Sequence, residues 1–199
     1  MTPPVVLASQ SASRRAMLDA AGVTYEALPA HVDEAAIKDA LVAEGQPVRN
    51  IADALAELKS IKISRQVSPA LVIGSDSMVS VDGVLFDKPE GRDGAERHLR
   101  AFSGKEMRLT SAVVVAEGGT PMWRHVEEAR LLVRPLSDGF IESYLDAEWP
   151  AIAGCVGCFR MEGPGVQLFS SVRGDHFTIL GMPLLPLLGY LRLRGAMTS

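Results

Sequence analysis

Residues Leu71–Ser77, with the sequence LVIGSDS, indicate how this chain folds. The apolar run that begins this stretch is typical of a buried strand in an α/β sheet. Because open α/β sheets bind ligands at the carboxyl ends of their strands, we expect Asp76 at a strand end, where it can hold a metal or orient a water. Gly74 would let a ligand approach the backbone, and Lys88, beyond a short hairpin, can pair with phosphate. The alternative is a strand followed by an ordinary turn.

A second polar cluster follows the apolar strand predicted at Val5–Ala8. Its side chains are Ser9, Ser11, Ser13, Arg14 and Arg15. A helix is predicted over Ser13–Ala21, and either of the two later serines can cap it. Hydroxyls, free N–H groups and two guanidinium groups together suit a triphosphate. The alternative is a capped surface helix that carries two solvated arginines.

Composition narrows the class of protein. A chain of 199 residues can bury a real core, and we expect a single domain over residues 1–199. Hydrophobic content of 47% and charged content of 22% are typical of a soluble globular protein. The net charge of -4 argues against binding to nucleic acid or to an anionic membrane. Because no signal peptide or membrane span is apparent, a cytoplasmic protein is expected.

The two cysteines, Cys155 and Cys158, form a C-x-x-C pair. No second pair completes a zinc site. A thioredoxin-like motif should open a helix, whereas these cysteines are flanked by glycines. We therefore expect inert small residues in a tight turn or a strand, and a zinc or redox function is disfavoured.

Predicted strands and helices alternate along the chain. Strands are expected at Val5–Ala8, Tyr25–Leu28, Leu71–Ser75, Met107–Ala116 and Met122–Val133. Helices are expected at Ser13–Ala21, Glu34–Glu44, Val48–Arg65, Gly91–Ala101, Ser137–Ala147 and Pro183–Arg194, with glycine-punctuated strands before the last helix. Together with hairpin signals before Phe86 and at Glu117–Thr120, this pattern predicts an α/β fold: a mixed twisted sheet with flanking helices and antiparallel hairpins.

Several motifs of one known family occur in order along the chain. They are Leu7-Ala8-Ser9-x-Ser11-x-x-Arg14-Arg15, Val32-Asp33-Glu34, Ala56-Glu57-Leu58-Lys59, Ile73-Gly74-Ser75-Asp76 with Lys88-Pro89, Ser103-Gly104, Met161-Glu162-Gly163, Gly174-Asp175 and Leu180-Gly181-Met182-Pro183. In these motifs the chain resembles the Maf (septum-formation-inhibitor-like) nucleotide pyrophosphatases over nearly its whole length. The resemblance implies a Maf/ITPase-like fold with a nucleotide cleft between two lobes.

The resemblance also implies an activity. Maf proteins hydrolyse a nucleoside triphosphate to the monophosphate and diphosphate with a divalent metal, and favour non-standard or selected nucleotides. The family's catalytic aspartate matches Asp76, and its arginine and lysines match Arg14, Lys59 and Lys88. We therefore take Asp76 and the two lysines as catalytic. Asp76 is either the base that activates water or a ligand of the metal that does so.

Three acidic residues, Glu34, Asp76 and Asp175, are candidate ligands for Mg²⁺ or Mn²⁺, which prefer oxygen donors. For Glu34 the alternative is a carboxylate that stabilises a helix N-terminus through the dipole. For Lys59 the alternative is a solvated helix face.

Substrate contacts are expected from Ser9, Ser11, Ser13, Arg14, Arg15, Ser77 and Glu162. The dTTP/UTP branch of the family usually has an arginine at position 13 and Gln-Gly where this chain has Glu162-Gly163. The 7-methyl-GTP branch shares the Glu-Gly form but has tryptophan and glutamine at the Ser13 and Ser77 positions. The chain is nearer the second branch, and a purine or methylated guanine is expected ahead of uracil and thymine because a carboxylate can accept from the guanine edge.

A different class of function is a nucleotide-binding regulatory protein that affects cell division through a protein partner. The presence of Asp76, Lys59 and Lys88 favours the enzyme. Apolar surface on the helix at Leu184–Leu193 also suggests a homodimer.

Overall fold

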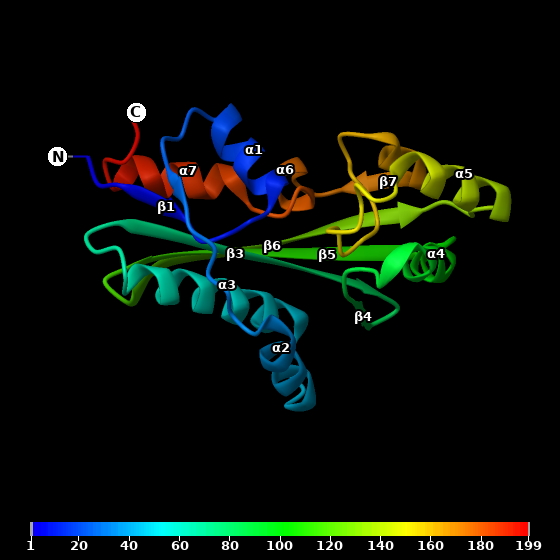
Figure 1. The fold of residues 1–199 in the computed structure, drawn as a ribbon, viewed down its shortest axis with the longest axis horizontal. Coiled ribbons are helices and arrows are strands. Elements are labelled where there is room, and N and C mark those ends of the chain that lie inside the picture. Colours follow the sequence, from blue (N-terminus) through cyan, green and yellow to red (C-terminus); the bar gives the residue numbers. More distant parts are fainter. Residues whose placement is uncertain (1, 199) are drawn as a thin grey trace. The chain divides into compact units, whose positions relative to one another are not determined.

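A mixed sheet of seven strands organises the computed structural model, which describes residues 2–198 (Figure 1). The strand order is β2-β1-β3-β5-β6-β7, and β4 pairs with β3 outside this path. β1 (Val5–Leu7) runs parallel to β2 (Glu26–Ala27) and to β3 (Leu71–Val81). The pairs β3–β4 and β6–β7 are antiparallel. The predicted α/β fold with a mixed sheet is confirmed.

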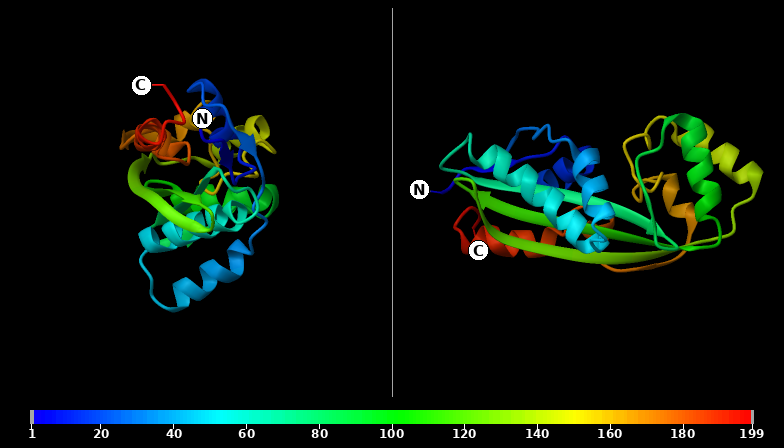
Figure 2. Two further views of the ribbon diagram at one scale, coloured as in Figure 1. Left: turned by 90° about the vertical axis from the view of Figure 1, so that its left-hand side faces the viewer. Right: turned by 90° about the horizontal axis from the view of Figure 1, so that it is seen from below.

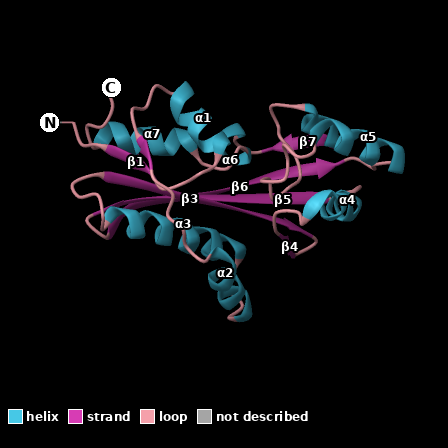
Figure 3. Ribbon diagram, viewed as in Figure 1, coloured by secondary structure: helices cyan, strands magenta, loops and turns pink. Residues whose placement is uncertain are grey.

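Most predicted elements form within one or two residues of their expected bounds (Figure 3). The helices are α1 (Ala12–Ala20), α2 (Glu34–Ala43), α3 (Val48–Ser64), α4 (Gly91–Phe102), α5 (Asp138–Glu148), α6 (His176–Ile179) and α7 (Leu184–Leu193). The other strands are β4 (Val84–Phe86), β5 (Glu106–Glu117), β6 (Thr120–Val133) and β7 (Phe169–Arg173). Gly118 and Gly119, both at positive φ, join β5 to β6 in the two-residue turn that a hairpin favours.

The segment before α7 differs from its prediction. Only β7 is a strand there, and turns, a 3-10 helix at Pro164–Leu168 and α6 take the place of the other expected strands. Glycines in this segment serve close turns: a Cβ on Gly165 would lie 2.5 Å from the carbonyl oxygen of Arg160.

The described chain divides into two compact units. The first comprises residues 2–77, 110–127 and 176–198, and the second comprises residues 78–109 and 128–175. The prediction of a single domain over residues 1–199 stays a prediction. No helix among the described residues is both long and apolar enough to cross a membrane.

The core of the first unit explains why Leu71–Ile73 is a continuous apolar run. Leu71 and Ile73 pack in one cluster with α1 and α7, whereas Val72 packs in a second cluster with Ile63 of α3. Figures 1 and 2 show these helices on opposite faces of the strands. A strand that is buried on both faces needs apolar side chains at every position, which is the usual state of a parallel strand.

Two expectations for the central stretch are wrong. β3 continues to Val81, so Asp76 lies inside the strand and not at its end. The strand continues because its later residues pair with β4, beginning at Val79 opposite Phe86. The second expectation is that Gly74 makes room for a ligand. It makes room for α3 instead: a Cβ there would lie 2.1 Å from the carbonyl oxygen of Ala56 and 2.7 Å from the backbone nitrogen of Ser60. Only glycine therefore lets α3 approach β3 this closely.

Candidate active site

A buried lysine joins two carboxylates in the first unit. Lys59 Nζ of α3 donates to Asp76 Oδ1 of β3 at 2.6 Å and lies 3.0 Å from Glu34 Oε1, at the start of α2. The side chains of Lys59 and Asp76 are only 8% and 9% exposed, whereas that of Glu34 is 49% exposed. The alternative of a solvated lysine is therefore wrong.

The local fold explains this meeting. Alternate residues of a strand point to the same face, so Gly74 and Asp76 both face α3. The close approach of α3 at Gly74 brings Lys59, one residue before Ser60, to the carboxylate. The ion pair between Lys59 and Asp76 thus depends on Gly74, which takes no part in the pair but lets α3 come close to β3.

Burial and charge act in opposite directions on Asp76. Desolvation raises the pKa of its carboxyl above the ordinary value, and the positive charges of Lys59 and Arg14 oppose that shift. A carboxylate with a raised pKa holds a proton more readily, which suits a proton acceptor. The same burial lowers the pKa of Arg14, against the attraction of Asp76 and Glu34.

Arg14 is held inside the protein. Arg14 is 9% exposed, and its Nε donates to the Gly181 carbonyl at 2.9 Å. Nη1 donates to Ser9 Oγ at 3.3 Å, and Nη2 donates to Ser77 Oγ at 3.1 Å. The alternative of two solvated arginines on a surface helix is wrong for this residue.

The hydroxyl-rich turn forms as predicted. Ser11 caps α1 by accepting from the backbone N–H of Arg14, and its Oγ lies 2.9 Å from Ser13 Oγ. The backbone N–H of Ser11 donates to Ser9 Oγ at 3.2 Å. Arg15 follows Arg14 on α1, and its buried Nε has no hydrogen-bond partner among the described residues. The structure therefore places Ser9 and Ser77 at the guanidinium of Arg14, and Ser11 at its backbone N–H.

The remaining predicted residues, Lys88, Glu162 and Asp175, belong to the second unit. Lys88 follows β4, and Glu162 lies in the turn before the 3-10 helix. Both residues influence the pKa of the Cys155 thiol. Burial and the negative charge of Glu162 raise this pKa, and the positive charge of Lys88 lowers it. Lys88 and Glu162 thus lie within electrostatic range of one thiol.

An ion pair that sequence reasoning missed, between half-exposed Arg160 and buried Glu148, lies beside the turn of Glu162. Arg160 donates to both carboxylate oxygens of Glu148, at 2.9 and 3.0 Å, and the Glu148 side chain is 3% exposed. A Cβ on Gly163 would lie 3.7 Å from each of those oxygens. The sequence does contain a signal for this ion pair. Glu148 follows Ile141 and Leu145 on the buried face of α5, and a charged side chain on a buried face needs a partner of opposite charge.

Comparison with known proteins places the chain in a family. A family model described as Maf-like protein matches residues 4–194. The chain belongs to the Maf family.

Curated relatives cover the chain almost end to end. A nucleoside triphosphate pyrophosphatase of Sphingopyxis alaskensis is 50% identical over 192 residues, 96% of this chain and 97% of the relative. One of Granulibacter bethesdensis is 46% identical over 98% of each chain. A 7-methyl-GTP pyrophosphatase of Rhizobium meliloti is 45% identical over the whole of both chains.

Two of the three predicted metal ligands of this Maf protein meet at one lysine. Among residues 2–198 no three His, Cys, Asp or Glu side chains form a group that could hold a metal ion. Glu34 and Asp76 do converge, with the Lys59 ammonium between them. Carboxylate oxygens are the donors that a hard divalent metal prefers, and these two carboxylates lie within reach of one cation. Asp175 belongs to the second unit, and its role as a ligand stays a prediction.

The cysteines lie in consecutive turns, as expected. The backbone N–H of Cys158 donates to the Cys155 carbonyl at 3.0 Å, and both thiols are free. Burial raises the pKa of Cys158 to about 12, so this thiol stays protonated.

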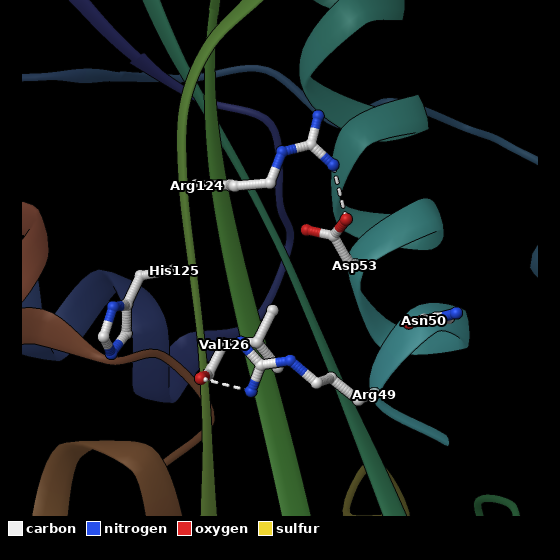
Figure 4. Close-up of a pocket in the computed structure, with 6 residues that line it drawn as sticks. All are labelled: Arg49, Asn50, Asp53, Arg124, His125 and Val126. Atoms are coloured by element: carbon white, nitrogen blue, oxygen red, sulfur yellow. Dashed lines mark hydrogen bonds and ion pairs between the residues drawn. The ribbon is translucent and has the colours of Figure 1, made fainter. Parts of the chain in front are cut away.

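A recess of about 180 Å³ lies elsewhere in the first unit, between α3 and β6 (Figure 4). It is lined by Arg49, Asn50, Asp53, Arg124, His125 and Val126. Its lining residues bind one another: Arg49 Nη1 donates to the backbone carbonyl of Val126 at 3.0 Å, and the side chains of Arg124 and Asp53 form an ion pair. None of the predicted site residues lines this recess, so it is not the candidate active site.

Proposed function

We propose that this chain hydrolyses a nucleoside triphosphate to the monophosphate and diphosphate. The observation that carries the proposal is the buried Lys59–Asp76 pair, with Arg14 within electrostatic range, in a Maf chain. Its curated relatives named nucleoside triphosphate pyrophosphatase support the same reaction. A regulatory protein that affects cell division through a partner is not favoured by those names.

The residues divide the work by charge. A triphosphate carries several negative charges, and Arg14, Lys59 and Lys88 neutralise and position it. Asp76 accepts the proton of the attacking water or holds the metal that activates that water. A raised pKa at Asp76 supports the first of these roles.

A divalent cation, Mg²⁺ or Mn²⁺, completes the proposal. Glu34 and Asp76 would hold it, since their carboxylates lie close enough together to contact one cation. When bound, the cation stabilises negative charge that develops on the transferring phosphoryl group. Lys59 stays within reach of both carboxylates and keeps Asp76 oriented.

Diphosphate release tests the reaction directly. Purified protein with Mg²⁺ or Mn²⁺ is expected to release diphosphate from at least one nucleotide in a panel of canonical and modified triphosphates. Diphosphate and orthophosphate are measured separately. Orthophosphate alone would contradict cleavage between the α and β phosphates, and tight binding without turnover would favour the regulatory protein.

The proposed substrate is a purine or methylated guanine nucleotide, and clearance of modified nucleotides is the proposed role. Glu162, in the turn beside the ion pair of Glu148 and Arg160, would accept hydrogen bonds from the guanine edge. The relative named 7-methyl-GTP pyrophosphatase favours this choice. A cytoplasmic location and a homodimer remain predictions; Leu185 and Leu193 of α7 are exposed, as a dimer surface would require.

Glu162→Gln is expected to lower kcat/KM for the best purine substrate, relative to UTP or dTTP, by about tenfold. Glu162 is exposed in the structure, so the contact would become buried only when the base binds. A polar contact buried in this way is worth roughly 1–3 kcal/mol when its partner is lost, and about 1.4 kcal/mol corresponds to tenfold in rate. Both substrates are measured on the wild type and the variant. Glu142→Gln, which changes an exposed carboxylate of α5, is the matched control. An unchanged ratio would mean that the base is recognised by other residues.

A further inference from the structure

Hydroxyl groups and a backbone carbonyl surround the buried guanidinium of Arg14. The Gly181 carbonyl accepts from Arg14 Nε at 2.9 Å and from Ser75 Oγ at 3.1 Å. Ser75 and Ser77 alternate with Gly74 and Asp76 along β3, so they point to the opposite face from the Lys59–Asp76 pair. The Lys59–Asp76 pair therefore lies on one face of β3, and the serines that contact the Arg14 guanidinium and the Gly181 carbonyl lie on the other.

Ser77 has more neighbours than its one hydroxyl hydrogen can reach. Its Oγ lies 3.1 Å from Arg14 Nη2, 3.0 Å from the Gly181 carbonyl oxygen and 2.9 Å from Ser111 Oγ. A serine hydroxyl donates once and accepts up to twice. The direction of each hydrogen bond therefore follows from the atoms that can only accept or only donate.

Ser111 settles the direction. Its Oγ lies 2.8 Å from the Thr178 carbonyl oxygen, which can only accept, so the Ser111 hydrogen points there. The Gly181 carbonyl, 3.0 Å from Ser77 Oγ, already accepts from Arg14 Nε and from Ser75 Oγ, and these two donors use both lone pairs of its oxygen. Ser77 therefore donates to Ser111 and accepts from Arg14. The result is a directed chain from Arg14 through two hydroxyls to the Thr178 carbonyl, and such chains strengthen each member by polarisation.

Some N–H donors of Arg14 are not used by these hydrogen bonds. A guanidinium has five N–H donors. Three are used, toward the Gly181 carbonyl, Ser9 and Ser77. The other two are not engaged by any described residue, and paired N–H donors suit phosphate oxygens.

We propose that Ser77 and Ser111 are positioning residues that orient Arg14 toward the phosphates of the substrate, and that Ser77 does not recognise the base. The inference rests on the proposed function for the identity of the ligand. It also changes the interpretation of Ser77, which the family comparison had placed in the base pocket. The Ser77 hydroxyl is already committed to Arg14 and Ser111 within the first unit.

The first test measures Arg14 directly and needs no substrate. In the wild type, the Arg14 Nε–H should exchange slowly with solvent by NMR because it is buried and donates to the Gly181 carbonyl. Ser111→Ala should speed that exchange by about fivefold, since a hydrogen bond contributes about 1 kcal/mol. Ser64→Ala is the matched control: its buried hydroxyl donates to the Ile61 carbonyl and accepts from the Gly119 N–H. Equal exchange in wild type and Ser111→Ala would overturn the proposal.

The second test is a double-mutant cycle on hydrolysis. Ser111→Ala should lower kcat/KM about tenfold for purine and pyrimidine triphosphates alike, and should have almost no further effect in an Arg14→Lys background. Additive effects, or a Ser77→Ala variant that changes the ratio between purine and pyrimidine substrates, would overturn it. If the wild type releases no diphosphate from any nucleotide, the proposed function fails, and the NMR measurement still decides the role of Ser111.

Discussion

Asp76→Asn is expected to lower turnover about a hundredfold or more while the protein stays folded. Loss of a catalytic base costs on the order of a hundredfold or more, and loss of a metal ligand acts in the same direction. The asparagine oxygen keeps the shape needed to accept from Lys59 Nζ, now 2.6 Å from the carboxylate, but carries no charge. Steady-state release of diphosphate at saturating Mg²⁺ measures the loss.

Asp82→Asn is a matched control for this variant. Asp82 is also an aspartate paired with a lysine, since its carboxylate lies 3.0 Å from Lys105 Nζ, but both side chains are well exposed. Asparagine also tolerates the positive φ of this position. The control should keep wild-type turnover. If Asp76→Asn also kept it, with an unchanged melting temperature, Asp76 would be neither base nor metal ligand.

Gly74→Ala is expected to destabilise the protein by about 1–3 kcal/mol or more, the cost of overpacking a core. The added Cβ would lie 2.1 Å from the Ala56 carbonyl oxygen, a backbone atom that cannot turn aside. α3 must therefore move away from β3, and Lys59 moves with it. For a chain of this size each kcal/mol lowers the melting temperature by about 2–4 °C. Thermal unfolding measures the effect, and kcat should fall as well in the protein that remains folded.

Gly139→Ala provides the comparison, because a Cβ at this helical position meets no atom within 4 Å. Alanine there should leave stability unchanged or raise it by about 0.4–1 kcal/mol. If both alanine variants melted like the wild type, the close approach of α3 to β3 would not depend on Gly74.

Local sequence patterns accounted for most elements. The helix at Ala12–Ala20 follows from its serine cap, and the continuous run at Leu71–Ile73 follows from burial on both faces. Both patterns depend on neighbours within a few residues, so they can be recognised from the sequence alone. The family motifs also predict Arg14, Lys59 and Asp76 as residues of the candidate site, and the structure places Asp76 in contact with Lys59.

Long-range packing decided what those residues do. The sequence predicted Asp76 at a strand end and Gly74 beside a ligand, but β3 continues through both, and Gly74 admits α3. Lys59 and Asp76 are 17 positions apart, and Ser111 and Thr178 are 67 positions apart, so no periodic signal in the sequence indicates either contact. Such contacts form only when distant segments pack, because periodicity records which face of an element is buried and not which residues meet there.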